Sequence, residues 1–371
     1  MVAWAITKVL IPLLQNNKVL DFPNSRSSHR VPTPTCGGAG IIAGLAGGLI
    51  TASLLGMQIP TPPLLLGGVL ISLVGFIDDR SGGVSVPLRL TTQFSAAGIV
   101  VFNVGGIGTL PLPEPMDLQT GVLAIPLALT WIVAVTNIYN FLDGIDGFAA
   151  LQGAIAGLCI ALLGQGGHLV IMGLVIAGAC CGFLLHNWHP AKIFMGDIGS
   201  GTLGFLLAAL PFQLGSSSSR GDALYAIGMC LWFFLSDASF TILRRIWRGE
   251  CLWKAHRSHL YQLLVDSGLR HDQVVLRVNA GASIIAALAL VSIHISGSTN
   301  ARWVVIAVAV GAFVAYCFWT WVRIRTLSRR YSEPRTGQST DSSKHPSGLG
   351  RATIMPDGRA RETESAQLIQ P

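Results

Sequence analysis

Long apolar segments separated by short polar loops follow one another along most of the 371-residue chain. An α-helix needs roughly 20 mainly apolar residues to cross a bilayer, and many of these segments approach that length. We therefore predict an all-α polytopic membrane protein with about eleven transmembrane helices. The expected spans are residues 1–14, 37–57, 60–77, 90–107, 121–136, 148–164, 168–185, 201–215, 223–243, 278–295 and 303–322.

The composition supports a membrane protein. Hydrophobic residues make up 51% of the chain and charged residues only 12%, whereas soluble domains carry roughly 25% charged residues. From residue 332 onward the chain is rich in Ser, Gly, Pro, Arg and Glu and has few large apolar residues, which is typical of disordered segments. We expect an integral membrane domain at residues 1–325 and a disordered cytoplasmic tail at residues 326–371.

Basic residues indicate how the chain is oriented. If the loop after the first span is placed on one side, that side receives most of the lysines and arginines, whereas the other side receives little beyond Arg220 and Arg302. Cytoplasmic loops carry such an excess, so the expected N-terminus is periplasmic and the C-terminus cytoplasmic. The same distribution accounts for the net charge of +7. Because the chain has no basic-aromatic stripe, we expect a lipid bilayer and no nucleic acid as its partner.

Acidic residues end several of the spans on the side predicted to be cytoplasmic. They are Asp78 and Asp79, then Asp143 and Asp146 within N-I-Y-N-F-L-D-G-I-D-G, and Asp197 within I-F-M-G-D-I-G-S-G. Charged groups near hydrocarbon are costly and usually functional. If a helix begins at Asp143, both carboxylates of that motif share one face near its N-terminus.

Each acidic motif also has a simpler interpretation. Arg80 could neutralise the Asp78–Asp79 pair, and the other carboxylates could cap helices or form turns. Five carboxylates on one membrane surface would repel one another unless a cation lay among them. Their hard oxygen atoms favour Mg²⁺, with Mn²⁺ as the alternative.

Two cationic loops complete the polar side. In K-A-H-R-S-H-L-Y-Q, His256 and His259 lie three residues apart with Arg257 between them. No third soft ligand stands nearby for zinc, so binding of phosphate is favoured, and a plain basic juxtamembrane loop is the alternative. The proline-rich loop at residues 21–38 offers Arg26, His29 and Arg30 to anions.

Together these motifs resemble the polyprenyl-phosphate N-acetylhexosamine-1-phosphate transferases of glycosyltransferase family four. The resemblance covers roughly residues 20–261 and is strongest in N-W-H-P-A-K-I-F-M-G-D-I-G-S-G-T-L-G at residues 187–204. It also includes R-S-S-H, the D-D pair, N-x-x-N-x-x-D-G-x-D-G and H-R-S-H-x-Y-Q. Thr35 and Cys36 depart from it, because relatives usually have Arg and Gly there.

The resemblance implies transfer of an amino-sugar 1-phosphate from a UDP-sugar to undecaprenyl phosphate, with release of UMP at the cytoplasmic face of a bacterial inner membrane. It implies that Asp197 and Asp79 bind Mg²⁺, and that Asp78, Asp79 and Asp143 act in catalysis. The substrate-binding residues that it implies are Asn137, Asn140, Asp146, Lys192, His256, Arg257, His259 and Arg30.

The last histidine motif indicates a branch of the family. H-R-S-H-L-Y-Q resembles the branch that starts O-antigen chains with N-acetylated sugars such as FucNAc or QuiNAc, and GlcNAc is a further candidate. A muramyl-pentapeptide phosphotransferase and a lipid-linked sugar transporter are the alternative functions. Direct transfer and a covalent intermediate both stay open, and a homodimer is one of the oligomeric states that the sequence allows.

Overall fold

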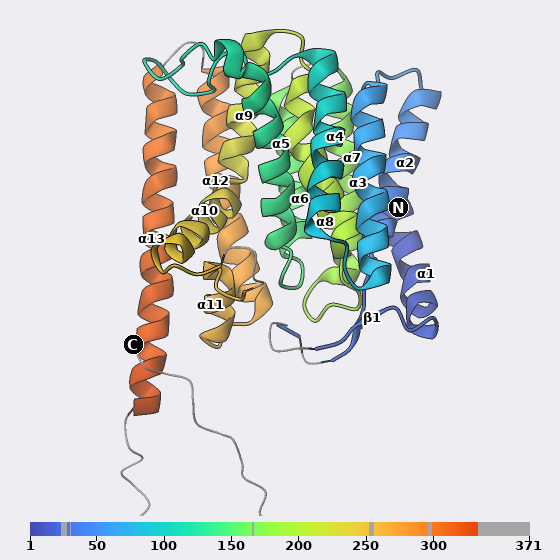
Figure 1. Cartoon of the computed structure of the whole chain (residues 1–371), viewed down its shortest axis with the longest axis vertical. Coiled ribbons are helices and arrows are strands. Elements are labelled where there is room, and N and C mark those ends of the chain that lie inside the picture. The colour runs from blue at the N-terminus through green and yellow to red at the C-terminus, as the bar shows by residue number, and fades with distance from the viewer. Residues whose placement is uncertain (24–27, 30, 165–166, 252–255, 296–298, 333–371) are drawn as a thin grey trace, which may run out of the picture. The chain divides into compact units, whose positions relative to one another are not determined.

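The structure is a computed structural model that describes residues 1–23, 28–29, 31–164, 167–251, 256–295 and 299–332. In this part of the chain nearly all regular structure is helical, as predicted (Figure 1). The long helices are α1 (Val2–Asn16), α2 (Gly38–Leu54), α3 (Pro62–Ser81), α4 (Val86–Val104), α5 (Ala124–Phe141), α6 (Phe148–Leu163), α7 (Gly167–Asn187), α8 (Gly196–Ala209), α9 (Ser217–Cys230), α10 (Trp232–Trp247), α12 (His271–His294) and α13 (Thr299–Ser332).

Short elements connect the long helices. These are α11 (Leu260–Asp266), the 3₁₀ turns η1 (Gly121–Leu123) and η2 (Leu210–Gln213), and the antiparallel strands β1 (Leu20–Asp21) and β2 (Thr33–Pro34). Helix α13 continues through the predicted domain boundary at residue 325. The tail at residues 333–371 lies outside the described residues, so the predicted division into domain and tail stays a prediction.

A helix occupies each of the apolar segments, but the predicted number of eleven spans is not confirmed. Within the described ranges, five helices are long and apolar enough to cross a membrane, or six if α9 and α10 form one bent span. Helix α1 has 15 residues, which at 1.5 Å per residue is about 22 Å and less than the ~30 Å hydrocarbon core. The predicted orientation of the two termini is likewise not confirmed.

The predicted span at residues 223–243 is not one continuous helix. The chain breaks at Leu231, and α10 turns by 70° from α9. Helix α10 carries Asp237 in its middle and Arg244 and Arg245 in its last turn. These groups would be costly in hydrocarbon, so the bend allows α10 to lie obliquely beside α12 and α13 (Figure 1).

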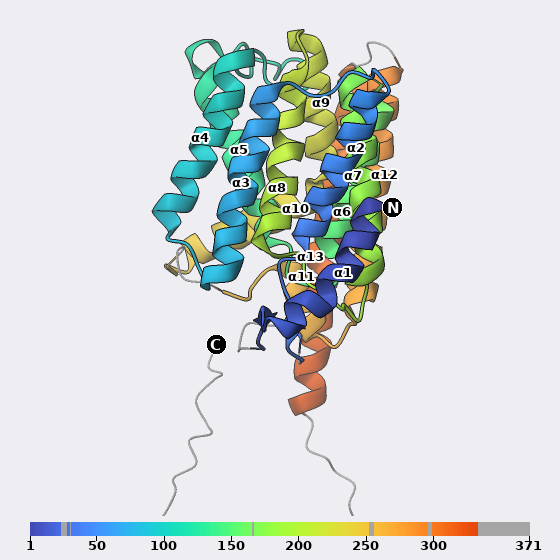
Figure 2. The ribbon, with the colours of Figure 1, turned by 90° about the vertical axis from the view of Figure 1, so that its right-hand side faces the viewer.

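Helix α8 forms the centre of the bundle. It packs against α3 and α5 (Figure 2), and every residue from Ile198 to Ala209 is buried. The contact with α3 is close, because a Cβ atom on Gly75 would lie 2.6 Å from the backbone carbonyl carbon of Asp197. This close approach, of the kind that small residues permit between membrane helices, places the C-terminal turn of α3 beside the N-terminus of α8.

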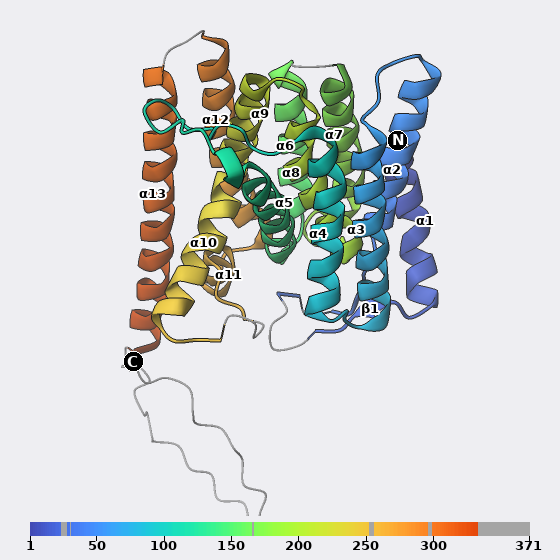
Figure 3. The same ribbon diagram turned by 45° about the horizontal axis from the view of Figure 1, so that its top comes forward.

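The polar connections gather at one end of the bundle. Strand β1, helix α11 and the connections from α5 to α6 and from α7 to α8 all lie at this end, whereas the connection from α4 to η1 lies at the other (Figures 1 and 3). Segments that are far apart in the sequence therefore surround one common space.

Candidate active site

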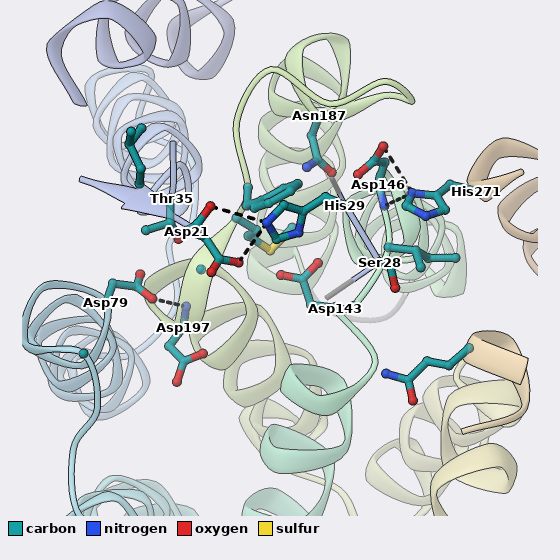
Figure 4. A pocket seen from close by; sticks show the side chains of 18 residues that line it. Asp21, Ser28, His29, Thr35, Asp79, Asp143, Asp146, Asn187, Asp197 and His271 are labelled. Atoms are coloured by element: carbon teal, nitrogen blue, oxygen red, sulfur yellow. Dashed lines mark hydrogen bonds and ion pairs between the residues drawn. The ribbon is translucent and has the colours of Figure 1, made fainter. Parts of the chain in front are cut away.

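A polar cavity of about 510 Å³ lies at this end of the bundle. Residues from the β1–β2 region, the end of α3, the α5–α6 connection, the start of α8, α11 and the start of α12 line it (Figure 4). Four of the five predicted carboxylates line the cavity: Asp79, Asp143, Asp146 and Asp197. The fifth, Asp78, lines a small adjoining space together with Asp197.

Asp79 joins the end of α3 to the start of α8. Its carboxylate accepts hydrogen bonds from the backbone N–H groups of Asp197 at 2.8 Å and Ile198 at 3.3 Å. The first N–H groups of a helix have no partner inside the helix and favour an anion. Asp79 therefore stabilises the N-terminus of α8 and holds Asp197 beside the cavity.

Arg89 supplies a positive charge among these carboxylates. Its Nη2 atom lies 2.8 Å from Oδ2 of Asp78 and 2.9 Å from Oδ2 of Asp197. The ion pair of Asp78 is thus made by Arg89 and not by Arg80, whose guanidinium lies over the ring of Phe76. The sequence motifs do not single out Arg89.

The two predicted asparagines of α5 lie in different surroundings. The side-chain nitrogen of Asn140 donates to Oδ1 of Asp197 at 2.9 Å and to the Ser200 hydroxyl at 2.8 Å. Asn137 instead exchanges hydrogen bonds with Gln93 of α4. Asn140 thus belongs to the carboxylate cluster, whereas Asn137 connects two helices beside it.

Asp143 and Asp146 precede a helix instead of sharing its face. Helix α6 begins at Phe148, because the chain first turns through Gly144 and Gly147. The two carboxylates consequently point in different directions (Figure 4). Burial raises the pKa of Asp143 well above its usual range, and the negative charges of Asp197, Asp79 and Asp146 raise it further.

Asp146 is bound by two histidines. Its Oδ2 atom lies 2.6 Å from Nδ1 of His189 and 3.2 Å from Nδ1 of His271, and it accepts the Ala191 N–H at 3.2 Å. Burial opposes ionisation of Asp146, but the hydrogen bonds from His271 and His189 outweigh it and lower the pKa. The three ligand atoms lie within 4.8 Å of one another and match the donor set of a transition-metal site. His189 and the Ala191 N–H already bond to this oxygen atom, and Nδ1 of His271 also lies 3.3 Å from the backbone N–H of Asp146, from which it can accept.

The predicted histidine loop is only partly at the cavity. His256 and His259 do not share a helix face, because both precede α11. His259 is buried and its Nδ1 atom lies 3.1 Å from Oδ1 of Asp237. Burial, with His259 and Arg245 nearby, lowers the pKa of His256 to about 4. Neither ring lines the cavity, whereas the side chain of Gln262, from the same motif, does.

Two further predicted residues, Arg257 and Lys192, contribute less directly. Arg257 pairs with Asp266 at 2.8 Å and contacts the Ser28 hydroxyl at 3.3 Å. Lys192 is exposed, and its backbone N–H binds the His186 carbonyl. Arg30 lies outside the described residues.

The structure adds polar residues that the motifs did not single out. They are Arg89, His189, Asp237, Gln262 and His271. Gln262 and His189 stand inside quoted motifs, so their positions could have been considered there. The contacts of Arg89, Asp237 and His271 join segments that are far apart in the sequence, so the sequence does not predict them.

Comparison with known proteins identifies the family of this chain. Residues 62–215 match the model of the family described as "Glycosyl transferase family 4". The decaprenyl-phosphate N-acetylglucosaminephosphotransferase of Mycobacterium tuberculosis (strain H37Rv) is 31% identical in an alignment of 351 positions that covers 84% of this chain and 84% of that one. A probable undecaprenyl-phosphate N-acetylglucosaminyl 1-phosphate transferase of Bacillus subtilis is 31% identical over 261 residues, 69% of this chain and 72% of that one.

A second kind of relative is also similar. The phospho-N-acetylmuramoyl-pentapeptide-transferase of Synechococcus sp. (strain RCC307) is 35% identical over 271 residues, covering 66% of this chain and 71% of that one. All three relatives are named as phospho-sugar transferases, and the resemblance read from the motifs is confirmed. The chain, a multi-pass membrane protein, therefore belongs to glycosyltransferase family 4.

Proposed function

We propose that this protein transfers an N-acetyl-aminosugar 1-phosphate from a UDP-sugar to undecaprenyl phosphate and releases UMP. The reaction takes place at the cytoplasmic face of a bacterial inner membrane and initiates O-antigen or another surface polysaccharide. The observation that carries this proposal is the gathering of Asp79, Asp143 and Asp197 around one polar cavity at the end of an apolar bundle. The names of the family relatives support the type of reaction.

The residues fit a magnesium ion. Asp79, Asp197 and Asn140 offer hard oxygen atoms, the ligands that Mg²⁺ prefers. The backbone also leaves room, because Gly196 has φ of 72° and a Cβ atom there would lie 2.3 Å from Oδ2 of Asp79. Asp197 and Asp79 would hold the ion. When bound, Mg²⁺ neutralises the diphosphate of the donor and the charge on departing UMP.

The residues of the chain position the two substrates. The acceptor phosphate attacks the sugar-linked phosphorus in line and displaces UMP, so catalysis consists mainly of positioning and charge stabilisation. Arg89 places a guanidinium beside Asp78, where it can bind the phosphate of the lipid. Asp143 faces the cavity (Figure 4) and can accept the last proton of that phosphate. Phosphate monoesters lose this proton near pH 6, so its contribution is modest.

The lipid acceptor can approach from the side of the bundle. A shallow groove along one face of α4 is lined mainly by apolar side chains that include Leu90, Phe94 and Phe102, and Arg89 of the same helix lines the small space that holds Asp78 and Asp197. Phe94 and Phe102 expose 45% and 72% of their surface. An apolar groove on the helix that carries Arg89 suits a molecule with a long prenyl chain and a phosphate at one end.

Two donor classes are compared in the test. N-acetylhexosamines are supported by the names of two relatives, and the FucNAc or QuiNAc type by the motif H-R-S-H-L-Y-Q. A muramyl-pentapeptide donor is the second candidate, because the Synechococcus relative is named for that reaction.

Purified protein is incubated with undecaprenyl phosphate, Mg²⁺ and UDP-linked GlcNAc, GalNAc, FucNAc, QuiNAc or muramyl-pentapeptide, and UMP is measured. Release of UMP with an N-acetyl-aminosugar supports the proposal, whereas no release with any donor refutes it.

A further inference from the structure

Gln262 is the residue of α11 that reaches the cavity. It is the third residue of that helix, and its side chain is 8% exposed and lines the cavity together with Asp143 and Gly144. Its Oε1 atom accepts a hydrogen bond from the backbone N–H of His259 at 3.2 Å. This bond assigns the orientation of the amide group, because only the oxygen atom can accept it.

The position of Gln262 is fixed from two sides. The buried Asp237 of α10 accepts the backbone N–H groups of Leu260 at 3.0 Å and Tyr261 at 3.1 Å, together with the His259 ring. The hydroxyl of Tyr261 donates to the carbonyl of Phe141 at the end of α5. The start of α11 is therefore held against α10 and α5 before any substrate binds, as a residue that contacts substrate requires.

The cavity needs hydrogen-bond donors. Asp143, Asp146 and Asp197 line it with oxygen atoms, whereas a nucleotide-sugar presents mostly oxygen acceptors on its sugar and diphosphate. The NH₂ group of a glutamine supplies two donors without adding charge. The side chain of Gln262 also hydrogen-bonds to Tyr261. With Oε1 bound to His259 and one N–H directed to the Tyr261 hydroxyl, the second N–H is what the side chain can offer to a ligand.

We propose that Gln262 contacts the donor substrate and donates a hydrogen bond from its side-chain NH₂ group to an oxygen of the nucleotide-sugar. The inference rests on the proposed function, since it names a residue that binds the UDP-sugar of that reaction. Gln262 thus takes the part that the sequence had given to His259, whose ring is instead bound to Asp237.

The chain offers a matched control. Gln273 has the same place at the start of α12 as Gln262 at the start of α11, and its Oε1 atom accepts the Arg270 N–H at 3.2 Å. Gln273 does not line the cavity. Gln262→Met and Gln273→Met therefore remove the same bond at a helix start, and only the first removes a donor from the cavity. Gln262→Glu keeps the acceptor for His259 and removes the NH₂ group.

The measurements are the KM of each substrate and the Kd of the UDP-sugar, determined without acceptor by calorimetry. Loss of one hydrogen bond of about 1.4 kcal/mol corresponds to a tenfold change. We expect Gln262→Met and Gln262→Glu each to raise KM and Kd for the UDP-sugar about tenfold, with the KM for undecaprenyl phosphate unchanged and Gln273→Met close to wild type.

Several results would overturn the inference. Equal effects of Gln262→Met and Gln273→Met would assign Gln262 to helix stability alone. An effect of Gln262→Glu without one of Gln262→Met would reflect repulsion by the new charge. If the wild type releases UMP while Gln262→Met keeps its affinity for the UDP-sugar, the inference fails and the proposed function stands. A wild type that neither turns over nor binds any UDP-sugar refutes both.

Discussion

Arg89 of α4 forms an ion pair with Asp197 of α8, with 2.9 Å between Nη2 and Oδ2. The same nitrogen atom lies 2.8 Å from Oδ2 of Asp78 on α3. One guanidinium thus connects three helices at the place where their carboxylates would otherwise repel one another. A phosphate or a divalent ion that enters the cluster must change these contacts, so Arg89 is expected to act in the reaction as well as in the fold.

Replacing Arg89 tests this expectation. Arg89→Gln removes the charge and leaves Asp78 and Asp197 unpaired, so we expect the rate of UMP release to fall about 100-fold or more. Arg89→Lys should restore part of the rate, because it restores the charge without the planar guanidinium. Arg80→Gln is the control, since Arg80 is exposed at the same end of α3, and it should change the rate less than about threefold. Near-normal turnover of Arg89→Gln would restrict Arg89 to a structural role.

Features that depend on a segment's own residues can be predicted from the sequence. Segment length and hydropathy located the helices, because a membrane span depends mainly on its own residues. The bend at Leu231 is not predicted, and α10, which follows it, carries Asp237 to hydrogen-bond partners on α11, outside that apolar segment. Hydropathy averaged over a span does not show such a contact.

The candidate site was predicted in part for the same reason. The carboxylates of the motifs do gather at one end of the bundle, and Asp79, Asp143 and Asp197 line one cavity. The motifs could not show which basic side chain lies nearest to these carboxylates, because Arg89 and Asp197 belong to different helices. Similarly, the resemblance predicts that His259 binds the substrate, whereas in the structure its Nδ1 atom bonds to the carboxylate of Asp237 on α10.

Asp197 is expected to be required for metal-dependent turnover. Asp197→Asn keeps the size of the side chain but removes a charged ligand, so UMP release should fall by a factor of about 1,000 and should not recover with excess Mg²⁺. The protein should still insert and elute as the wild type does. Asp222→Asn is the control, because Asp222 pairs with Arg302 away from the cavity. Activity close to wild type would show that Asp197 serves only the N-terminus of α8.

The raised pKa of Asp143 predicts how stability depends on pH. In the folded protein this carboxyl group holds its proton above the usual range near 3.9, whereas in the unfolded chain it does not. Between the two pKa values the folded state binds more protons, so the contribution of Asp143 to stability falls as pH rises. Above the pKa of a free aspartate, Asp143 therefore destabilises the folded state relative to the unfolded state, in which the group ionises more readily.

Asp143→Asn should therefore raise the melting temperature in detergent near pH 8, measured with EDTA present, by about 2 °C for each kcal/mol gained. The difference from wild type should shrink as the pH falls towards the pKa of a free aspartate. Asp146→Asn serves as the opposite control, because the pKa of Asp146 is lowered by its histidines and its ionised form stabilises the fold. A melting temperature of Asp143→Asn below wild type at pH 8 would contradict the prediction.

Asp237 is expected to be needed for the fold around α11. Its Oδ1 atom accepts from the His259 ring, the Leu260 N–H and the Thr241 hydroxyl, and its Oδ2 atom accepts the Tyr261 N–H. Asp237→Asn replaces one of these acceptors by an NH₂ group that must face a donor. An unsatisfied buried group next to a lost charge costs about 3 kcal/mol, so the melting temperature should fall by roughly 6 °C or more.

Asp237→Asn also tests whether Asp237 positions α11 at the cavity in addition to stabilising the fold. Because α11 carries Gln262 into the cavity, Asp237→Asn should also raise the KM for the UDP-sugar more than the KM for undecaprenyl phosphate, measured well below the melting temperature. Glu250→Gln is the control, since Glu250 is exposed and pairs with Arg245 near the end of the same helix. A loss of stability with both KM values unchanged would show that Asp237 holds α11 without affecting the cavity, and unchanged stability would contradict the network of hydrogen bonds itself.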